Sequence, residues 1–292
     1  MSVKLVEKIF NAPVPHYVGD GFRVHNFIPS LNGLSMQRMD PFLMLDYNSQ
    51  YIFPPSEKQK GVGVHPHKGF ETVTIAYKGS VAHHDSAGNS GVIYEGDVQW
   101  MTAASGVLHK EYHEKEFSKK GGVFQMVQMW VNLPAEFKLT SPKYQAISNS
   151  SLGKYFLDNN QGLIEVIAGE YNGIKGPAST FTEINVLNSI LEDDAEAAFS
   201  FPAEFTTFLL LIEGSLIINN SEIVLTDQLA LFHYKGENFN LKAREKSKIL
   251  ILSGKPIKEP IAAYGPFVMN TREEIVGAYN EFHTGKFGFL ED

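Results

Sequence analysis

The chain has 292 residues, 43% of them hydrophobic and 20% charged, a balance that fits neither a disordered chain nor a membrane protein. Its formal charge is -8, and no run of Lys and Arg would neutralise many phosphates, which argues against direct nucleic-acid binding. Cysteine is absent, so disulfides, iron–sulfur clusters and thiol nucleophiles are excluded, and any metal must bind to nitrogen and oxygen ligands.

The length predicts two domains, because a domain has roughly 100 to 200 residues. We expect them to comprise residues 1–140 and 141–292. Residues 1–17 lack the apolar stretch of a signal peptide, and no segment offers about 18 consecutive apolar residues for a membrane span. The expected location is therefore the cytoplasm, or also the nucleus if the source is eukaryotic, with no membrane partner.

Short runs of strand-forming residues, broken by turn residues, extend from about residue 61 to residue 133. Glycines punctuate these runs at a spacing typical of a sandwich or barrel of short antiparallel strands: Gly79, Gly88, Gly91, Gly96 and Gly106. Residues 121–133 form the last run, which Pro134 ends, and the polar residues after it predict a connection up to about Ser151.

Two pairs of metal-ligand residues lie within these runs. His65 and His67 are separated by one residue, so on a strand their side chains share a face, roughly 6.6 Å apart along the strand. His109 and Glu111 repeat that spacing. If the two strands are neighbours, three imidazoles and one carboxylate meet and form a site suited to Fe, Mn, Ni, Cu or Zn. With one or two coordination positions open, such a site supports chemistry rather than structure alone.

Three further histidines lie close to these pairs in sequence. His113 shares the face of His109 and Glu111 if the strand continues, although an exposed histidine at a strand end is the more common case. His83 and His84 are adjacent and must project to opposite faces, so at most one of them points inward. We expect both of these to be structural.

A second β-rich stretch begins near Ile164 and echoes the first. Aligning residues 74–81 (TIAYKGSV) with residues 209–216 (LLLIEGSL) places two strand-turn-strand junctions over one another and predicts an internal duplication. The same alignment places His65, His67 and Glu71 over residues that form no ligand set: Ser200, Pro202 and Thr206. We therefore expect a second barrel without metal, which stabilises the first barrel or presents a surface to a partner.

The carboxyl end predicts a short amphipathic helix. Thr271 and Glu274 have the spacing of a capping box, and apolar residues recur at helical spacing from Ile275 to Phe282. The helix should end near Gly285. The pattern as a whole predicts two consecutive small β-barrels with the terminal helix packed on one of them.

Five stretches of the sequence resemble the pirin family of bicupins, and together they span nearly the whole chain: HPHKGFETV (65–73), GDVQWMTAASGVLHKEY (96–112), MVQMWVNLP (126–134), AGEYNGIKGP (168–177) and GPFVMNTREEI (265–275). The resemblance implies an all-β fold of two consecutive cupin barrels, which are double-stranded β-helices of the jelly-roll type. It places the metal in the amino-terminal barrel, and the internal alignment predicts none in the carboxyl-terminal barrel.

The resemblance to pirins also implies an Fe(II) or Fe(III) site with His65, His67, His109 and Glu111 as ligands. Manganese, nickel, copper or zinc can occupy such a site in place of iron. Glu71 is the competing carboxylate, because it stands at the ligand position of many other cupins. We favour Glu111 as the ligand, with Glu71 as a residue that supports the ligands from behind.

The function implied by the resemblance is a quercetin 2,3-dioxygenase type of reaction, in which a flavonol-like aromatic substrate is opened with O2. Glu111 would be the catalytic residue that accepts the substrate hydroxyl proton. An alternative is a non-enzymatic regulator whose metal state controls binding to a protein partner, as animal pirins act on transcription factors. A metal-dependent isomerase or hydrolase is a third, weaker alternative.

Large apolar residues near the motifs allow two interpretations: Trp100, Met101, Phe124, Met126 and Trp130. They either fill the barrel interior, which is the more common case, or line a pocket for a flat substrate. Their alternation with Gln125 and Gln128 indicates a lining of mixed polarity.

Overall fold

The computed structural model describes residues 2–291, which are 52% strand and 11% helix. They form two compact units, one comprising residues 13–149 and 257–292 and the other residues 1–12 and 150–256. We refer to them as the first barrel and the second barrel. The mostly β architecture predicted from the sequence is confirmed. None of the helices in residues 2–291 combines the length and the apolar composition needed to cross a membrane.

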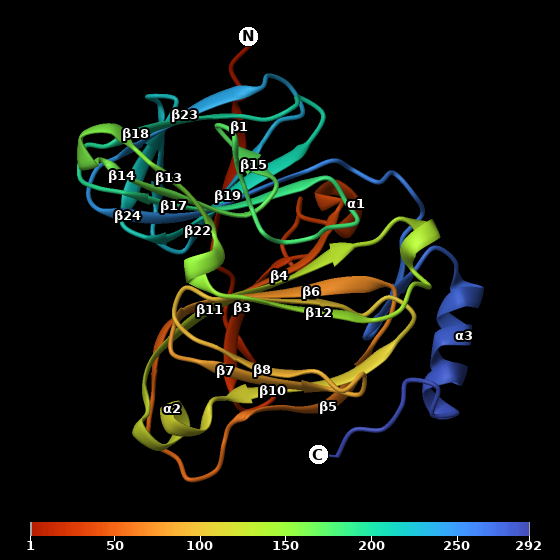
Figure 1. Cartoon of the computed structure of the whole chain (residues 1–292). Helices are drawn as coiled ribbons and strands as arrows, with labels where there is room; N and C mark the ends of the chain where they lie inside the picture. Colours follow the sequence, from red (N-terminus) through yellow and green to blue (C-terminus); the bar gives the residue numbers. More distant parts are fainter. Residues whose placement is uncertain (1, 292) are drawn as a thin grey trace. The chain divides into compact units, whose positions relative to one another are not determined.

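The first barrel has two main antiparallel sheets (Figure 1). Its seven-stranded sheet contains, in spatial order, β12 (Lys143–Ile147), β9 (Val98–Thr102), β6 (Phe70–Lys78), β11 (Gly122–Asn132), β4 (Phe42–Phe53), β3 (Phe22–Ile28) and β2 (His16–Val18). Its four-stranded sheet contains β5 (Gly61–His67), β10 (Val107–His113), β7 (Val81–Asp85) and β8 (Ser90–Ile93). Short helices connect these strands: α1 (Met36–Met39), α2 (Lys115–Lys120) and η1 (Ala135–Phe137).

Strand β10 shows how the sequence pattern builds the interior of the first barrel. Every second side chain of β10 is buried: Val107, His109, Glu111 and His113. The residues between them are partly exposed. Because side chains alternate along a strand, the buried set lies on one face, which is the face directed toward the seven-stranded sheet.

The second barrel is built in the same way around an apolar interior. Its larger sheet contains, in spatial order, β1 (Val6–Asn11), β22 (Gln228–Phe232), β19 (Thr206–Glu213), β24 (Ser247–Gly254), β17 (Ile184–Leu191), β14 (Gly162–Ala168) and β13 (Gly153–Phe156). Its smaller sheet contains β18 (Glu196–Ser200), β23 (Asn238–Ala243), β20 (Ser215–Ile218) and β21 (Glu222–Leu225). A two-stranded ribbon and two short helices complete the connections: β15 (Glu170–Tyr171), β16 (Ile174–Lys175), η2 (Asn149–Ser151), which straddles the boundary, and η3 (Asp158–Asn160).

The two barrels have the same strand order in their smaller sheets, as the predicted duplication requires. Strands β18, β23, β20 and β21 take the places of β5, β10, β7 and β8. The aligned junctions turn at Gly79 and Gly214, whose φ angles are 81° and 93°, a region that favours glycine. In the second barrel the strands that replace β5 and β10 contribute apolar side chains to the interior, including Phe199, Phe239 and Leu241.

The boundaries of the two units differ from the predicted division into residues 1–140 and 141–292. The first 12 residues belong to the second barrel, because β1 pairs antiparallel with β22. Residues 257–292 return to the first barrel, where Phe267 forms a bridge with Lys68. Local patterns cannot show this exchange of chain ends, because both pairings join segments about 200 residues apart.

The returning segment carries a two-stranded ribbon, β25 (Ala262–Tyr264) and β26 (Phe267–Met269), and the predicted terminal helix, α3 (Arg272–His283). The capping box at Thr271 and Glu274 is present, which confirms the helix start. Lys68 attaches α3 to the barrel, because its Nζ donates to Glu281 Oε2 at 2.8 Å and to the Ser105 carbonyl at 2.6 Å.

Lys138 fixes the other end of this segment from inside the protein. Its side chain is buried, and its Nζ donates to the carbonyl of Gly69 at 2.7 Å, to Asn132 Oδ1 at 2.7 Å and to the carbonyl of Val268 at 3.2 Å. Burial lowers the pKa of Lys138 to about 8. One side chain thus links the residue before β6 with β11 and β26.

We expect Lys138→Met to lower the free energy of unfolding of the first barrel by about 2 to 4 kcal/mol, because three buried acceptors lose their donor. Urea unfolding followed by tryptophan fluorescence measures this selectively, since both tryptophans of the chain, Trp100 and Trp130, lie in the first barrel. The exposed Lys119→Met is the control and should change the value by no more than about 0.5 kcal/mol. Equal unfolding midpoints for the two variants would contradict this role of Lys138.

Candidate metal centre

Three of the predicted ligand residues meet because β5 and β10 are neighbouring antiparallel strands. His109 pairs directly with His65, and His67 pairs with Val107. The ring centroids are 4.2 Å apart for His65 and His109, 4.7 Å for His67 and His109, and 4.9 Å for His65 and His67. Each of these histidines offers a ring nitrogen within 4.8 Å of the other two.

Glu111, the fourth predicted ligand, lies in an adjoining group that shares His109. Its carboxylate lies within 4.8 Å of ligand atoms of His109 and His83. The pairing of β10 with β5 shifts register between His109 and Glu111, so that Glu111 stands opposite Val62. The structure therefore places His65, His67, His109 and Glu111 around one region of the barrel interior and adds His83, which we expected to be structural.

Burial keeps these imidazoles in the form that binds a cation. Burial, followed by repulsion from the neighbouring imidazoles, holds the pKa of His67 and of His109 well below the ordinary histidine value. Burial also lowers the pKa of His65. Neutral imidazoles have a lone pair to donate, whereas protonated ones do not.

Hydrogen bonds orient two of the three rings. His65 Nδ1 lies 2.8 Å from the carbonyl of Gly63, and His67 Nδ1 lies 3.3 Å from the carbonyl of Pro266. A carbonyl only accepts, so in each ring Nδ1 carries the hydrogen and Nε2 keeps its lone pair. An imidazole held from behind in this way is the usual arrangement of a metal-binding histidine.

The polar atoms left without partners fit a bound metal ion. Both ring nitrogens of His109 are buried, and neither has a hydrogen-bond partner within residues 2–291. Buried polar atoms are rarely left unpaired, because each one costs roughly 1 to 3 kcal/mol. Three imidazoles and a carboxylate are donors suited to Fe, Mn, Ni, Cu and Zn. A cation bound at this position would satisfy His109 and neutralise the carboxylate of Glu111.

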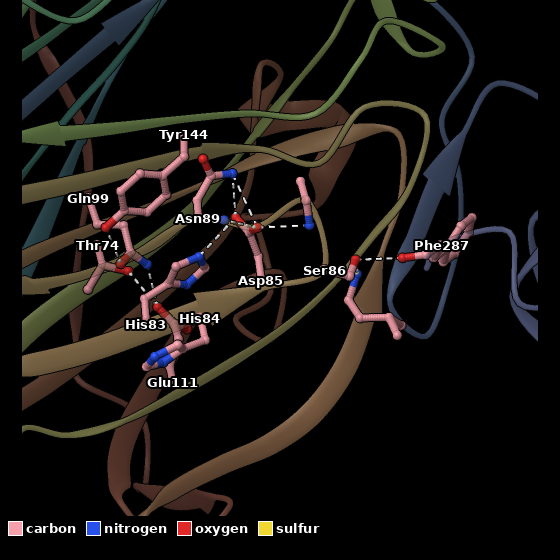
Figure 2. Close-up of polar contacts among 12 residues, drawn as sticks. Thr74, His83, His84, Asp85, Ser86, Asn89, Gln99, Glu111, Tyr144 and Phe287 are labelled. Carbon is pink, nitrogen blue, oxygen red and sulfur yellow. Dashed lines mark hydrogen bonds and ion pairs between the residues drawn. The ribbon is translucent and has the colours of Figure 1, made fainter. Parts of the chain in front are cut away.

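Three donors from the seven-stranded sheet surround the carboxylate of Glu111. Gln99 Nε2 donates to Oε1 at 2.8 Å and Thr74 Oγ1 donates to the same atom at 3.3 Å, as Figure 2 shows. Gln128 Nε2 donates to Oε2 at 2.6 Å. A carboxylate has about four lone-pair positions, so three are used and one, on Oε2, stays available.

The sequence singled out only one of these three donors. The alternation of residues 124–130 indicated Gln128 as part of a mixed lining, whereas nothing in the local sequence marked Thr74 or Gln99 as partners of Glu111. Their role as partners of Glu111 is visible only in the folded protein, where the four-stranded sheet packs against β6, β9 and β11.

Glu71 does not support the ligands, contrary to our expectation. Side chains alternate along β6, and Thr74, three residues later, points to Glu111, so Glu71 lies on the opposite face of the sheet. There it accepts a hydrogen bond from Thr102 Oγ1 at 2.7 Å. Burial raises the pKa of Glu71 to about 7.

The other predicted residues near the site divide between interior and surface. His83 points inward and His84 is exposed, as the alternation of adjacent residues required. His113 was expected at an exposed strand end, but it is buried. Its Nε2 lies 2.7 Å from the carbonyl of Gly21, outside the metal centre. Its ring packs against four others: Phe22, Phe53, Phe117 and Phe124.

One of the large apolar residues borders the metal centre. The Trp130 ring lies 5.2 Å from the His67 ring and is stacked on Phe70 at 4.2 Å. Trp100 instead pairs with Val73 and lies on the same face of the sheet as Glu71, away from the ligands. His65, Gln128 and Trp130 are only half-buried, so they mark the side on which the centre is accessible.

The chain matches two family models, one described as Pirin over residues 21–131 and one described as the Pirin C-terminal cupin domain over residues 186–288. It is 44% identical to a Pseudomonas aeruginosa protein named "putative quercetin 2,3-dioxygenase", over 98% of this chain and 99% of that protein. Pirin from Rattus norvegicus is 33% identical, over 93% of this chain and 89% of the rat protein.

A crystal structure of quercetin 2,3-dioxygenase from Acinetobacter baumannii is similar to this chain, with a TM-score of 0.93 and 45% sequence identity. The similarity covers 99% of this chain and 100% of that one. The predicted fold of two cupin domains is thereby confirmed.

We expect Glu71→Gln to stabilise the first barrel by about 2 to 3 kcal/mol at pH 8 and by little at pH 5. The pKa of Glu71 is about 7 in the folded protein and near 4.5 when the chain is unfolded, so ionisation above pH 5 costs folding energy that a neutral amide avoids. The contribution of Glu71 to the stability of the unaltered protein therefore falls as the pH rises through this range.

Urea unfolding at the two pH values, followed by tryptophan fluorescence, measures the difference. Glu57→Gln, which alters an exposed glutamate of the same unit, is the control and should show no such pH dependence. An equal effect of Glu71→Gln at pH 5 and pH 8 would show that Glu71 is ionised at both.

Proposed function

Because this chain belongs to the pirin family, we propose that it is a metal-dependent dioxygenase that opens a flavonol-like aromatic substrate with O2. One observation carries the proposal: buried imidazoles with unpartnered nitrogens converge beside a carboxylate inside the first barrel. The names of two similar bacterial proteins, from Pseudomonas aeruginosa and Acinetobacter baumannii, support the choice of reaction.

We propose His65, His67, His109 and Glu111 as the ligands and iron as the metal. Manganese, nickel, copper and zinc also suit these nitrogen and oxygen donors, because ligand type alone does not select among them. When bound, the ion would lower the pKa of a substrate hydroxyl and polarise the substrate.

The protein contributes orientation through hydrogen bonds behind the ligands. The carbonyls of Gly63 and Pro266 hold His65 and His67, and the amide of Gln99 holds Glu111. Preoriented ligands need not reorganise when substrate enters, which is the main way a rigid barrel assists a reaction.

Glu111 is proposed as the group that accepts the substrate hydroxyl proton. Its hydrogen bonds from Gln99, Thr74 and Gln128 leave one lone pair, on Oε2. That lone pair would either hold the ion or accept the proton, and in the proposed role Glu111 uses it for the proton.

An aromatic substrate is favoured by the accessible side of the centre. The half-buried Trp130 presents its ring beside His67, 5.2 Å between centroids. A flat ring system can pack against such a surface while its hydroxyl groups reach the ligands. This supports a flavonol more than an aliphatic acid, which offers no flat surface to the exposed part of the tryptophan ring.

Oxygen uptake with quercetin tests the proposal. Iron-loaded protein should consume O2, whereas metal-free protein should not. His109→Ala should reduce uptake at least about a hundredfold, because it removes the ligand shared by both groups of residues. His84→Ala, which alters the exposed neighbour of His83, is the control and should retain uptake.

The dioxygenase proposal would be refuted if protein with one bound iron per chain consumed no O2 with any of a panel of flavonols. The family alternative, a protein whose metal state controls binding to a partner, would then be tested with apo and iron-loaded protein in a pull-down.

We expect Glu111→Gln to reduce turnover by about a hundredfold to ten-thousandfold while iron is retained, because an amide cannot accept the proton. Iron content is measured beside oxygen uptake, and Glu57→Gln serves as the matched control on an exposed residue. Turnover close to that of the unaltered protein, at equal iron content, would remove Glu111 from the proton-accepting role and leave it as a ligand only.

A further inference from the structure

His83 belongs to the metal centre although neither sequence motif contains it. It lies on β7, pairs in register with Glu111 of β10, and has no exposed surface. One of its ring nitrogens lies within 4.8 Å of ligand atoms of His109 and Glu111. Figure 2 shows its imidazole between the side chains of Asp85 and Glu111.

Asp85 holds the outer nitrogen of this ring. His83 Nε2 lies 3.2 Å from Asp85 Oδ2. The carboxylate is itself anchored, because Oδ1 accepts from the backbone N–H groups of Ala87 and Asn89, both at 2.9 Å. The Asn89 side chain donates to both carboxylate oxygens, at 3.2 and 3.0 Å (Figure 2).

These hydrogen bonds all have the Asp85 carboxylate as the acceptor. Oδ1 accepts from two backbone N–H groups and both oxygens accept from Asn89, an arrangement that favours the ionised form. An ionised carboxylate only accepts, so the hydrogen shared with His83 is carried by Nε2.

In the neutral ring the inner nitrogen is a hydrogen-bond acceptor. In an imidazole with its hydrogen on Nε2, Nδ1 carries a lone pair. His83 Nδ1 is buried and has no hydrogen-bond partner within residues 2–291. Tyr144 keeps the ring in place, because the two rings are stacked 4.9 Å apart with an angle of 15° between their planes.

The donors around the centre are directed elsewhere. Thr74, Gln99 and Gln128 donate to Glu111, and the hydroxyl of Tyr144 donates to Gln99 Oε1 at 3.2 Å. In the part of the chain from 2 to 291, no donor is paired with His83 Nδ1. A buried polar atom left unpaired beside such a site needs a partner, and the hydroxyl of a ligand can supply one.

We propose that His83 Nδ1 accepts a hydrogen bond from a hydroxyl group of the organic ligand that enters the metal centre, and that Asp85 fixes the tautomer that makes this possible. His83 thus selects ligands with a hydroxyl donor beside the metal-binding group. The inference deepens the proposed function, since it rests on a hydroxylated aromatic as ligand, but it does not require that the ligand be oxidised.

The tautomer can be observed directly in metal-free protein by long-range ¹H–¹⁵N spectra of protein labelled on histidine. The His83 signals should show a hydrogen on Nε2 and a bare Nδ1. In Asp85→Asn the amide oxygen should keep the backbone N–H groups of Ala87 and Asn89, so the amide nitrogen faces His83 and the hydrogen moves to Nδ1. A hydrogen on Nδ1 in the unaltered protein would overturn the proposal.

Binding without turnover tests the selectivity. Zinc has no redox chemistry, so zinc-loaded protein is titrated with two flavones that share the metal-binding 3-hydroxyl. One is 3,2′-dihydroxyflavone, and the other is 3-hydroxy-2′-methoxyflavone, which lacks the neighbouring hydroxyl donor. The unaltered protein should prefer the dihydroxy compound about tenfold, the effect of one hydrogen bond. Asp85→Asn and His83→Phe should abolish that preference, and His83→Phe should leave the affinity for the methoxy compound unchanged.

His84→Phe is the matched control, because His84 is the adjacent residue, faces outward and forms its hydrogen bond with Tyr112. It should retain the preference, and zinc content should be equal in all variants. Loss of zinc from His83→Phe would identify His83 as a ligand and overturn the proposal. Equal affinity of the unaltered protein for the two flavones would also overturn the proposal, and so would no binding of either flavone. If the affinities are equal but the tautomer changes in Asp85→Asn, the donor to Nδ1 is a resident water and the proposal is again overturned.

The two proposals fail in different ways. A protein that prefers the compound with the additional hydroxyl through His83 but consumes no O2 with quercetin would keep this inference and lose the dioxygenase function. A protein that consumes O2 with quercetin but shows no preference between the flavones would do the reverse.

Discussion

The antiparallel pairing of β5 with β10 is the constraint on which the functional region depends. It places His65 opposite His109 and brings His67 to the same face, with ring centroids less than 5 Å apart. Three imidazoles inside a barrel are costly unless they are neutral and oriented. Burial keeps them neutral, and backbone carbonyls orient two of them, so the arrangement is prepared for a cation before one binds.

The seven-stranded sheet of the first barrel completes this polar interior. Thr74, Gln99 and Gln128 each project from a different strand toward Glu111, and together they compensate for the burial of its negative charge. Asp85 does the same for His83 from the end of β7. The outcome is a site in which outer hydrogen bonds define what the inner atoms can do. Nε2 of His65 and of His67 are acceptors, and Oε2 of Glu111 has one lone pair.

The second barrel shows that the strand order itself does not require this chemistry. It has the same order in its smaller sheet, yet Phe199, Phe239 and Leu241 fill its interior. The two barrels therefore share a framework and differ in what the inward positions carry, which is why a shared fold does not fix a function. In each barrel the chain also contributes a segment distant in sequence, β1 in the second and residues 257–292 in the first.

The sequence by itself determined the features that depend on neighbours along the chain. The one-residue spacing of His65 and His67, and of His109 and Glu111, fixes a common face for each pair, and the capping box at Thr271 fixes the start of α3. The glycine turns marked the strand junctions. Resemblance to pirins then supplied the cupin fold and the proposed ligands, which spacing alone left open among several metals.

Only the tertiary structure decided which faces point inward and which segments meet. Alternation put His83 and His84 on opposite faces but did not show that His83 is the inner one, and it did not show that Glu71 points away from the ligands. The partners of Glu111, the carbonyl of Pro266 behind His67 and the exchange of chain ends join residues from 12 to about 200 positions apart. Such contacts are set by strand neighbours and register in the folded protein, and a local sequence pattern carries neither.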